Sequence, residues 1–500
     1  MTAPDASSSA LTTHVGQRRA SHARVLRAAV PIAWVQIAVV LTGLVAYPFV
    51  RTVDPDFWWH LRTGELIIHH GIPRHDPFSW TAAGHAWVAH EWLSEALIYA
   101  VETAVGYYAN VLLYGAVVCA AILLMYRLGR AAGAGTRPLV LLMFVSVAVI
   151  GFYVTVRPQE FTWLLFAVFV YVLQRHDSGA RAPLWLLPPL MALWANLHLG
   201  FMYGLMLVAI WIGARVIARL RDPRIGLRMP VVLGAACAVA ATLNPHGPAL
   251  LWYPARYVFD PRITANVGEW QHPNPLYPLH APIFLTLLLL ALALVSRTRP
   301  RPFLWLVTLA MIALSLQAAR NAPFAALLLV PVAGEAMSRR WQAATSARDS
   351  RRRVPLALAA ALAVAVGGAV LAIGARQSGA VSFTRPSDRG YPAAEAAYVG
   401  AHFPGARLFN EYGDGGFLID ALYPGVKVGI DGRGDFYGGR LLADYATIYR
   451  ARAGWERLLD GYAPDVVLVP KTAPLAEALA RSGTWRQAFN GPDEVVFTRR

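Results

Sequence analysis

Residues 28–50 read AAVPIAWVQIAVVLTGLVAYPFV, and this apolar run follows a basic segment that contains Arg18, Arg19, Arg24 and Arg27. A helix needs about 20 apolar residues to cross the hydrocarbon core of a bilayer. The run is too long for the apolar core of a signal peptide, so it predicts an uncleaved membrane anchor. Residues 1–27 are then expected to form a basic cytoplasmic N-terminus.

Similar apolar runs recur as far as Gly374, and they decide the class of protein. Of the 500 residues, 56% are hydrophobic and 15% are charged, whereas soluble proteins carry about 25% charged residues. This composition excludes a soluble enzyme, a disordered chain and a disulfide-built protein. It predicts a polytopic α-helical membrane protein with about eleven transmembrane helices, near residues 28–50, 106–127, 137–156, 160–174, 183–198, 201–220, 229–246, 281–296, 303–318, 321–338 and 354–374.

The distribution of arginine predicts the topology. Residues 1–375 hold 30 Arg and no Lys against 15 acidic residues, so almost all of the net charge of +16 lies in this part. With eleven spans, 23 of these Arg residues fall on one side and seven on the other. Because basic residues concentrate in cytoplasmic loops, residues 376–500, called the tail below, are expected outside the cell. The charge is thus explained by topology, and no nucleic acid partner is expected.

The tail has the pattern of a small extracytoplasmic α/β domain. Apolar and polar residues alternate there between Gly and Pro. Strands alternating with helices predict a sheet of mostly parallel strands. The expected strands are 407–409, 426–430, 465–469 and 495–498, and the expected helices are 393–402, 439–450, 455–459 and 475–481.

Between the first two spans, residues 51–105 (loop 51–105 below) contain two amphipathic stretches. Phe57–His69 and Glu91–Ala104 each place apolar residues on one helical face and charged residues on another. Such helices are typical of segments that lie on a bilayer surface. Loop 51–105 belongs to the predicted transmembrane domain, residues 28–375. The loop also carries five tryptophans expected at headgroup depth, namely Trp58, Trp59, Trp80, Trp87 and Trp92.

Strongly polar groups recur at the predicted outer turns. Repeated ionisable groups at membrane depth indicate a functional site. The alternative is helix capping and snorkelling to headgroups. We predict that these turns meet loop 51–105 around one cavity, where Arg157 or Arg320 holds a phosphate. The turn residues assigned to substrate binding are Arg157, Glu160, His198, His246 and Arg320.

Two further motifs suggest chemistry. Asp54-Pro55-Asp56 opens loop 51–105, and two carboxylates at this spacing can share a divalent cation such as Mg²⁺ or Mn²⁺, or provide a general base. The alternative is an N-cap for the following helix. In the tail, Asp431 and Arg433 follow a strand, where α/β sheets bind ligands. Alternatively, these two residues pair with each other to hold their loop.

Other kinds of site have no support in the sequence. No phosphate-binding loop, dinucleotide fingerprint, His-Glu-x-x-His or Gly-x-Ser-x-Gly motif is present, so nothing indicates nucleotide binding. Cys119 and Cys237 both lie in apolar runs, and no disulfide framework or cysteine metal cluster is expected.

Several segments together carry a family resemblance. They are DPDFWWHL at 54–61, GE at 64–65, GIP at 71–73, DPFS at 76–79 and EWL at 91–93, with FNEY at 409–412 and IDGRGDFYG at 430–438 in the tail. These segments resemble bacterial polytopic GT-C-type glycosyltransferases, in the group of rhizobial lipopolysaccharide-core sugar transferases and protein mannosyltransferases. The resemblance covers most of the chain, and its motifs do not specify a substrate.

The resemblance implies an enzyme of the bacterial inner membrane that moves a sugar from a polyprenyl-phosphate donor to an envelope glycan, lipid or protein acceptor on the outer face. It implies inversion at the sugar carbon and an essential acid early in loop 51–105, which Asp54 and Asp56 match. His60, His85 or Glu91 would assist. Some relatives need a divalent cation and others do not. The alternative is a transport or non-catalytic component of polysaccharide assembly. A transporter should carry ionisable groups at mid-span, whereas the predicted spans are nearly free of them, and this favours the enzyme.

Overall fold

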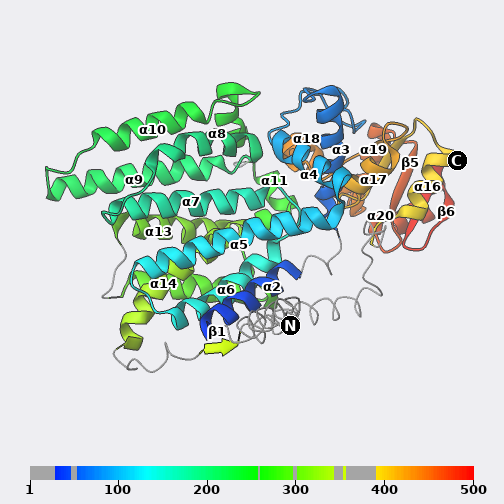
Figure 1. Cartoon of the computed structure of the whole chain (residues 1–500). Helices are drawn as coiled ribbons and strands as arrows, with labels where there is room; N and C mark the ends of the chain where they lie inside the picture. The colour runs from blue at the N-terminus through cyan, green and yellow to red at the C-terminus, as the bar shows by residue number, and fades with distance from the viewer. Residues whose placement is uncertain (1–28, 47–52, 257–259, 297–300, 343–352, 356–389) are drawn as a thin grey trace, which may run out of the picture.

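The computed structural model describes residues 29–46, 53–256, 260–296, 301–342, 353–355 and 390–500. A bundle of apolar helices forms most of the chain, and the tail with its sheet lies at one end of the bundle (Figure 1). The bundle elements are β1 (Ala29–Pro31), α2 (Ile32–Ala46), α5 (Tyr107–Ala131), α6 (Thr136–Tyr153), α7 (Gln159–Asp177), α8 (Leu187–Leu197), α9 (Phe201–Arg221), α10 (Arg228–Ala240), α11 (Pro261–Asn266), α12 (Ala281–Leu294), α13 (Pro302–Gln317), α14 (Ala322–Gln342) and β2 (Arg353–Pro355).

Four helices are long and apolar enough to cross a membrane: Tyr107–Ala131, Thr136–Tyr153, Phe201–Arg221 and Ala319–Arg339. Together with five shorter apolar helices they support a membrane location. The predicted count of eleven is not confirmed in the described part of the chain. The 13 residues of α10, for example, rise about 20 Å, which is less than the hydrocarbon thickness of about 30 Å. Most of the predicted span 354–374 lies outside the described residues.

The centre of the bundle is α14. Its apolar stretch is the most buried of the four candidate spans, at 89%, and it packs against α5, α6, α12 and α13. Alanines and a glycine in this helix present little side-chain bulk, which allows neighbouring helices to approach closely. The turns that follow α6, α8 and α13 therefore have fixed positions at one end of a tightly packed core.

The tail is built around a five-stranded sheet in the order β4-β3-β5-β7-β6. β3 pairs in parallel with β4 and β5, whereas β7 pairs antiparallel with β5 and β6. The prediction of mostly parallel strands therefore holds for β4, β3 and β5, whereas β7 and the unpredicted β6 form an antiparallel end of the sheet. The tail elements are α16 (Ala393–His402), β3 (Arg407–Asn410), α17 (Gly415–Leu422), β4 (Lys427–Val428), α18 (Gly434–Tyr449), α19 (Trp455–Tyr462), β5 (Val466–Pro470), α20 (Pro474–Arg481), β6 (Trp485–Asn490) and β7 (Glu494–Arg499).

The difference has a local cause. β6 and β7 are joined by the short connection Gly491–Asp493, which closes an antiparallel hairpin. β6 is the edge strand, and because most of its side chains are partly or fully exposed, the segment lacks the apolar pattern of a buried strand.

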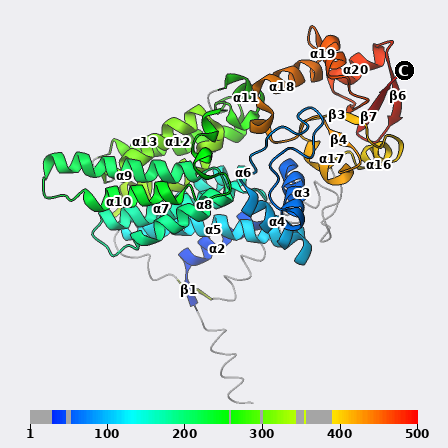
Figure 2. The ribbon, with the colours of Figure 1, turned by 90° about the horizontal axis from the view of Figure 1, so that it is seen from above.

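Loop 51–105 packs against both the bundle and the tail. Its helices α3 (Pro55–His70) and α4 (Trp92–Ala104) lie together, with α4 against α5 and α8 and α3 against α17 of the tail (Figures 1 and 2). The chain between these helices joins the sheet edge, where Ser79 forms a parallel bridge with Val428. One hydrophobic cluster, which includes Phe57, Trp58, Phe78, Leu408, Phe417, Val428 and Val466, spans the loop and the tail.

This packing corrects the expected position of the loop. Trp58, Trp59 and Trp87 are buried inside the protein rather than exposed to headgroups. Trp80 donates its indole N–H to the carbonyl of Leu408 in β3, 2.9 Å away. The apolar faces of the loop are therefore covered by the tail and the bundle.

Candidate active site

A cavity of about 1350 Å³ lies where loop 51–105, the turns of the bundle and the tail meet. As predicted, it brings together Arg157, His198 and Arg320 from three turns with residues of loop 51–105. Its ionisable lining also includes residues that the sequence did not single out. The charged or titratable side chains in the lining include Asp56, His60, His90, Glu91, Glu95, Arg157, His198, Glu269, Arg320 and Asp435.

Asp54 and Asp56 stand at the start of α3. Asp54 is the N-cap, and its Oδ1 accepts the backbone N–H of Asp56 at 3.0 Å. Asp56 lines the cavity, and its Oδ1 accepts the indole N–H of Trp59 at 3.1 Å. The N-cap interpretation is thus confirmed for Asp54, while Asp56 faces the space that a substrate would occupy.

Arg157 pairs with both carboxylates. Its Nε lies 2.9 Å from Oδ1 of Asp54, and its Nη2 forms an ion pair with Oδ2 of Asp56. Burial opposes the charge of Arg157, but the carboxylates of Asp54 and Glu269 outweigh burial and raise its pKa above the ordinary value. A guanidinium therefore stands where a cation shared by Asp54 and Asp56 would stand, and this geometry does not fit a divalent ion at the pair.

Glu269 links two arginines on the wall of the cavity. Its carboxylate lies 3.4 Å from Arg157 and 3.4 Å from Arg320. Arg320 also stacks on Trp270, with its guanidinium carbon 4.3 Å from the ring centroid. Burial favours a neutral Glu269, but Arg320 and Arg157 lower its pKa below the ordinary value. Arg157 also pairs with Asp54 and Asp56, so a phosphate bound here would have to replace a carboxylate as the partner of an arginine, with the bidentate geometry that guanidinium groups offer to phosphate.

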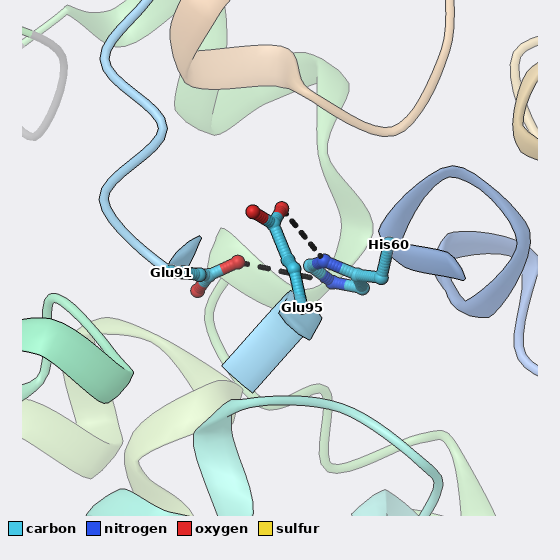
Figure 3. A group of neighbouring side chains, drawn as sticks. All are labelled: His60, Glu91 and Glu95. Atoms are coloured by element: carbon cyan, nitrogen blue, oxygen red, sulfur yellow. Dashed lines mark hydrogen bonds and ion pairs between the residues drawn. The ribbon is translucent and has the colours of Figure 1, made fainter. Parts of the chain in front are cut away.

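A second cluster joins α3 to α4. The carboxylates of Glu91 and Glu95 both turn toward the ring of His60 (Figure 3). His60 Nδ1 is 3.3 Å from Glu95, and His60 Nε2 is 3.8 Å from Glu91. Burial lowers the pKa of His60 well below the ordinary value, raises the pKa of Glu91 to about 7 and raises the pKa of Glu95 well above its ordinary value.

His198 approaches this cluster from the turn after α8. Its Nδ1 accepts the backbone N–H of Gly200 at 2.9 Å and lies 2.8 Å from the hydroxyl of Thr162. Because a backbone N–H only donates, Nδ1 of a neutral ring is unprotonated and the proton sits on Nε2. That nitrogen lies 3.3 Å from Oε1 of Glu91, so His198 presents an N–H to the carboxylate.

The tail closes over Asp56 by close backbone contact. A Cβ added at Gly432, in the connection after β4, would lie 1.8 Å from Oδ1 of Asp56. A Cβ added at Gly416, in α17, would lie 2.2 Å from the carbonyl oxygen of Pro55. Any side chain at these two positions would push the tail away from the start of α3. This close approach accounts for glycine at both positions.

Several predicted site residues have other contacts. Asp431 and Arg433 are both buried and paired, with Arg433 Nε 2.8 Å from Asp431, which supports the loop-holding alternative. Arg433 touches the cavity wall, but its guanidinium is held by Asp431 and Asp76. The assignment of both to substrate binding is therefore not supported by the geometry.

Three others lie outside the lining. Glu160 lies in the first turn of α7 and accepts the backbone N–H of Thr155 at 3.0 Å. This contact satisfies a backbone donor next to the start of a helix. His246 lies behind the wall near His90, and its backbone N–H bonds to Asn244. His85 is exposed in the turn between Asp76 and Trp87 and does not line the cavity, so the geometry does not support its predicted catalytic assistance.

Glu95, Glu269 and a contact from the tail lie at the site but were not among the predicted site residues. His90 Nε2 lies 3.3 Å from Asp435 in α18, and Tyr253 donates to the same carboxylate at 2.8 Å. Burial opposes a charge on His90, but Asp435 and Glu91 raise its pKa above the ordinary value. Glu91 and Glu95 are four residues apart on one helical face, and this spacing is the signal in the sequence that places the two carboxylates together.

Comparison with known proteins bears on the fold. No protein-family model and no curated protein sequence matches the chain. Among solved structures it is similar to the archaeal oligosaccharyltransferase AglB from Archaeoglobus fulgidus, determined with an inhibitory peptide and a dolichol-phosphate. The TM-score is 0.55 at 12% identity, over 87% of this chain and 69% of AglB. It also matches the mycobacterial arabinofuranosyltransferase AftD, with a TM-score of 0.48 at 14% identity, over 94% of this chain and 40% of AftD. The likeness to AglB shows that the fold of this chain is that of the GT-C-type membrane glycosyltransferases.

Proposed function

We propose that this protein is a membrane glycosyltransferase that moves a sugar from a polyprenyl-phosphate donor to a glycan, lipid or protein acceptor on the outer face of the bacterial inner membrane. The observation that carries the proposal is the position of Asp56. Its carboxylate lines a cavity of about 1350 Å³ together with Arg157, which is its ion-pair partner, and Arg320, which shares Glu269 with Arg157. A base and an anion site in one cavity are what transfer from a lipid-linked phosphate requires.

The two arginines are the proposed site for the donor phosphate. Arg320 reaches the cavity from the start of α14, and Arg157 reaches it from the turn after α6. The AglB structure, which shares the fold, holds a dolichol-phosphate, and this supports a lipid-linked phosphate as the ligand here. A phosphate bound by Arg157 would compete with the ion pair between Arg157 and Asp56, and so would free the carboxylate as the donor arrives.

The proposed transfer is a single displacement. Asp56 accepts the proton of an acceptor hydroxyl, and the hydroxyl oxygen forms a bond to the anomeric carbon of the sugar. The bond between that carbon and the phosphate oxygen breaks, and polyprenyl phosphate leaves with the electron pair. Attack from the face opposite the phosphate inverts the configuration at the sugar carbon. Arg157 and Arg320 stabilise the negative charge that develops on the leaving phosphate.

The test is a pair of matched substitutions in purified, detergent-solubilised protein. We expect Asp56→Asn to lower sugar transfer from a polyprenyl-phosphate donor by roughly 100- to 10,000-fold, because the amide cannot accept the proton. Asp54→Asn should have a much smaller effect, since Asn caps a helix nearly as well as Asp. The yield of monodisperse protein controls for folding. Full turnover by Asp56→Asn would rule out Asp56 as the base.

A further inference from the structure

We propose that His60, Glu91 and Glu95 form a binding site for one divalent transition-metal ion, separate from the Asp54 and Asp56 pair. The three residues offer one ligand atom each, and these atoms lie within 4.8 Å of one another. The inference goes beyond sugar transfer, and its test measures metal binding alone.

The spacing of the groups is close to that of a metal site. Bonds of about 2.0–2.1 Å to a tetrahedral ion place neighbouring ligand atoms about 3.3 Å apart. One nitrogen of His60 and one oxygen from each carboxylate lie within 4.8 Å of one another. The shortest contacts are 3.3 Å from Nδ1 to Glu95 and 3.8 Å from Nε2 to Glu91, and they involve different ring nitrogens. An ion would take one ring nitrogen and one oxygen from each carboxylate, and the side chains would move by up to about 1.5 Å to close around it.

The groups are held by rigid elements. His60 lies in α3, Glu95 lies in the first turn of α4, and Glu91 is the residue before that helix. The two glutamates are four positions apart, so they share one helical face. Ligands carried by packed helices keep their positions more accurately than ligands on free loops.

An unpartnered buried atom points to a ligand. Glu95 is 1% exposed, and its Oε2 has no hydrogen-bond partner within the described part of the chain. A buried carboxylate oxygen without a partner is costly. In the same described part, the ion-pair partners of Glu91 and Glu95 are all histidines. Neither carboxylate is therefore paired with Arg or Lys, and a metal ion would supply the missing positive charge.

The surroundings of the cluster also match a metal centre. Ligating carboxylates are usually oriented by a donor from a neighbouring residue. His198 presents its Nε2 proton toward Glu91 at 3.3 Å, and its other nitrogen is fixed by the backbone N–H of Gly200. The cluster lies on the cavity wall, so a fourth position of the ion would be open to water or to a substrate oxygen.

The ligand types select the class of metal. One imidazole nitrogen with two carboxylate oxygens suits Zn²⁺ or Mn²⁺, whereas Mg²⁺ and Ca²⁺ prefer oxygen ligands throughout. We therefore expect Zn²⁺ and the spectroscopic substitute Co²⁺ to bind, and Mg²⁺ to compete poorly.

The experiment uses the full chain in detergent, with any purification tag removed and bound metal stripped by a chelator. After equilibration with Zn²⁺, elemental analysis should find one equivalent per chain, and Co²⁺ should give d–d absorption bands of a low-symmetry site. His60→Gln and Glu95→Gln should both lose the equivalent. His198→Gln, which removes an orienting group, should weaken binding by about 10- to 100-fold.

Two controls make the assignment specific. His69 lies on the same helix as His60 but is exposed and hydrogen-bonded to Tyr99. The His69→Gln variant should therefore still bind one equivalent of metal. The Asp54→Asn/Asp56→Asn double variant should keep it as well. Absence of stoichiometric Zn²⁺ and Co²⁺ binding in the wild-type chain would overturn the proposal, and this result does not depend on the folding of any variant. Retention of the equivalent by His60→Gln, or its loss in the double variant, would also overturn it.

Discussion

The guanidinium of Arg433 donates to the carboxylate of Asp76 across 2.8 Å, although the two residues lie 357 positions apart in the chain. Both side chains are buried, and Arg433 also pairs with Asp431. The interaction fastens the tail to loop 51–105 next to the cavity. Arg433, the first residue of the segment Arg433-Gly434-Asp435 in the tail, therefore has a structural role.

We expect Arg433→Met to destabilise the protein strongly. Removing one partner of a buried ion pair costs about 3–5 kcal/mol, because the remaining charge is left without compensation. Here two carboxylates, Asp431 and Asp76, would lose their cation. The measurement is the thermal unfolding midpoint of the solubilised protein. Arg407→Met is the control, since Arg407 pairs with Asp465 at an exposed position, and a comparable loss there would contradict the argument.

Arg320→Met should both weaken donor binding and slow turnover, because the same charge is proposed to hold the donor phosphate and to stabilise it as it leaves. Methionine keeps an unbranched apolar stem but removes the guanidinium charge that we assign to the donor phosphate. A hydrogen bond to a charged group contributes about 1.5–3 kcal/mol, which corresponds to a rise in donor KM of about 10- to 100-fold. The measurement is steady-state transfer at varied donor concentration. Arg262→Met is the matched control, because Arg262 pairs with Asp260 outside the cavity.

The tail should lie outside the cytoplasm. The bias of 23 Arg to seven between the two sets of connections gives this orientation when the number of spans is odd. An alkaline phosphatase fused after Arg500 should be active in cells, and a fluorescent protein that folds only in the cytoplasm should be dark at the same position. The reverse pattern would place the cavity on the cytoplasmic side and remove the basis for a donor delivered at the outer face.

The apolar runs were sufficient to predict the helical bundle, because hydrophobic length depends on local sequence. The strands β3, β5 and β7 were also predictable, since each is a short buried run. The convergence of Arg157, His198 and Arg320 followed from topology, because turns on one side of a bundle meet at one end.

The partners of these groups were not predictable, because they are set by tertiary packing. Arg157 lies about 100 residues from Asp54 and Asp56 in sequence, and no local pattern indicates that it pairs with them. Glu91 and Glu95 lie on the polar face of an amphipathic helix, and this pattern is the same whether the face meets solvent or a polar cavity. The tryptophans of loop 51–105 looked interfacial for the same reason, since the covering tail is distant in sequence.

The last prediction concerns a group of carboxylates in the tail. Glu411, Asp414 and Glu494 lie near one another, and the backbone N–H of Glu494 donates to Glu395 at 3.2 Å. Burial, with the neighbouring Asp414, raises the pKa of Glu411 to about 7, and burial followed by Asp414 raises the pKa of Glu494 as well. Burial also raises the pKa of Asp414. Tyr445 and Tyr449 lie beside the group.

A carboxyl group whose pKa is higher in the folded than in the unfolded state contributes stability that is complete below the unfolded value, near 4.3, and is lost as pH rises through the folded value. The thermal midpoint should therefore decrease as the pH rises from about 4.3 to about 7, the folded pKa of Glu411, and Glu494 adds to this decrease. A pKa that is one unit higher in the folded protein corresponds to about 1.4 kcal/mol of stability. Glu411→Gln and Glu494→Gln, which keep a neutral side chain at every pH, should flatten this fall. Glu456→Gln, at an exposed position of α19, should not. A wild-type midpoint that rises across this range, with the same slope in Glu411→Gln and Glu494→Gln, would show that these carboxylates do not govern the pH dependence.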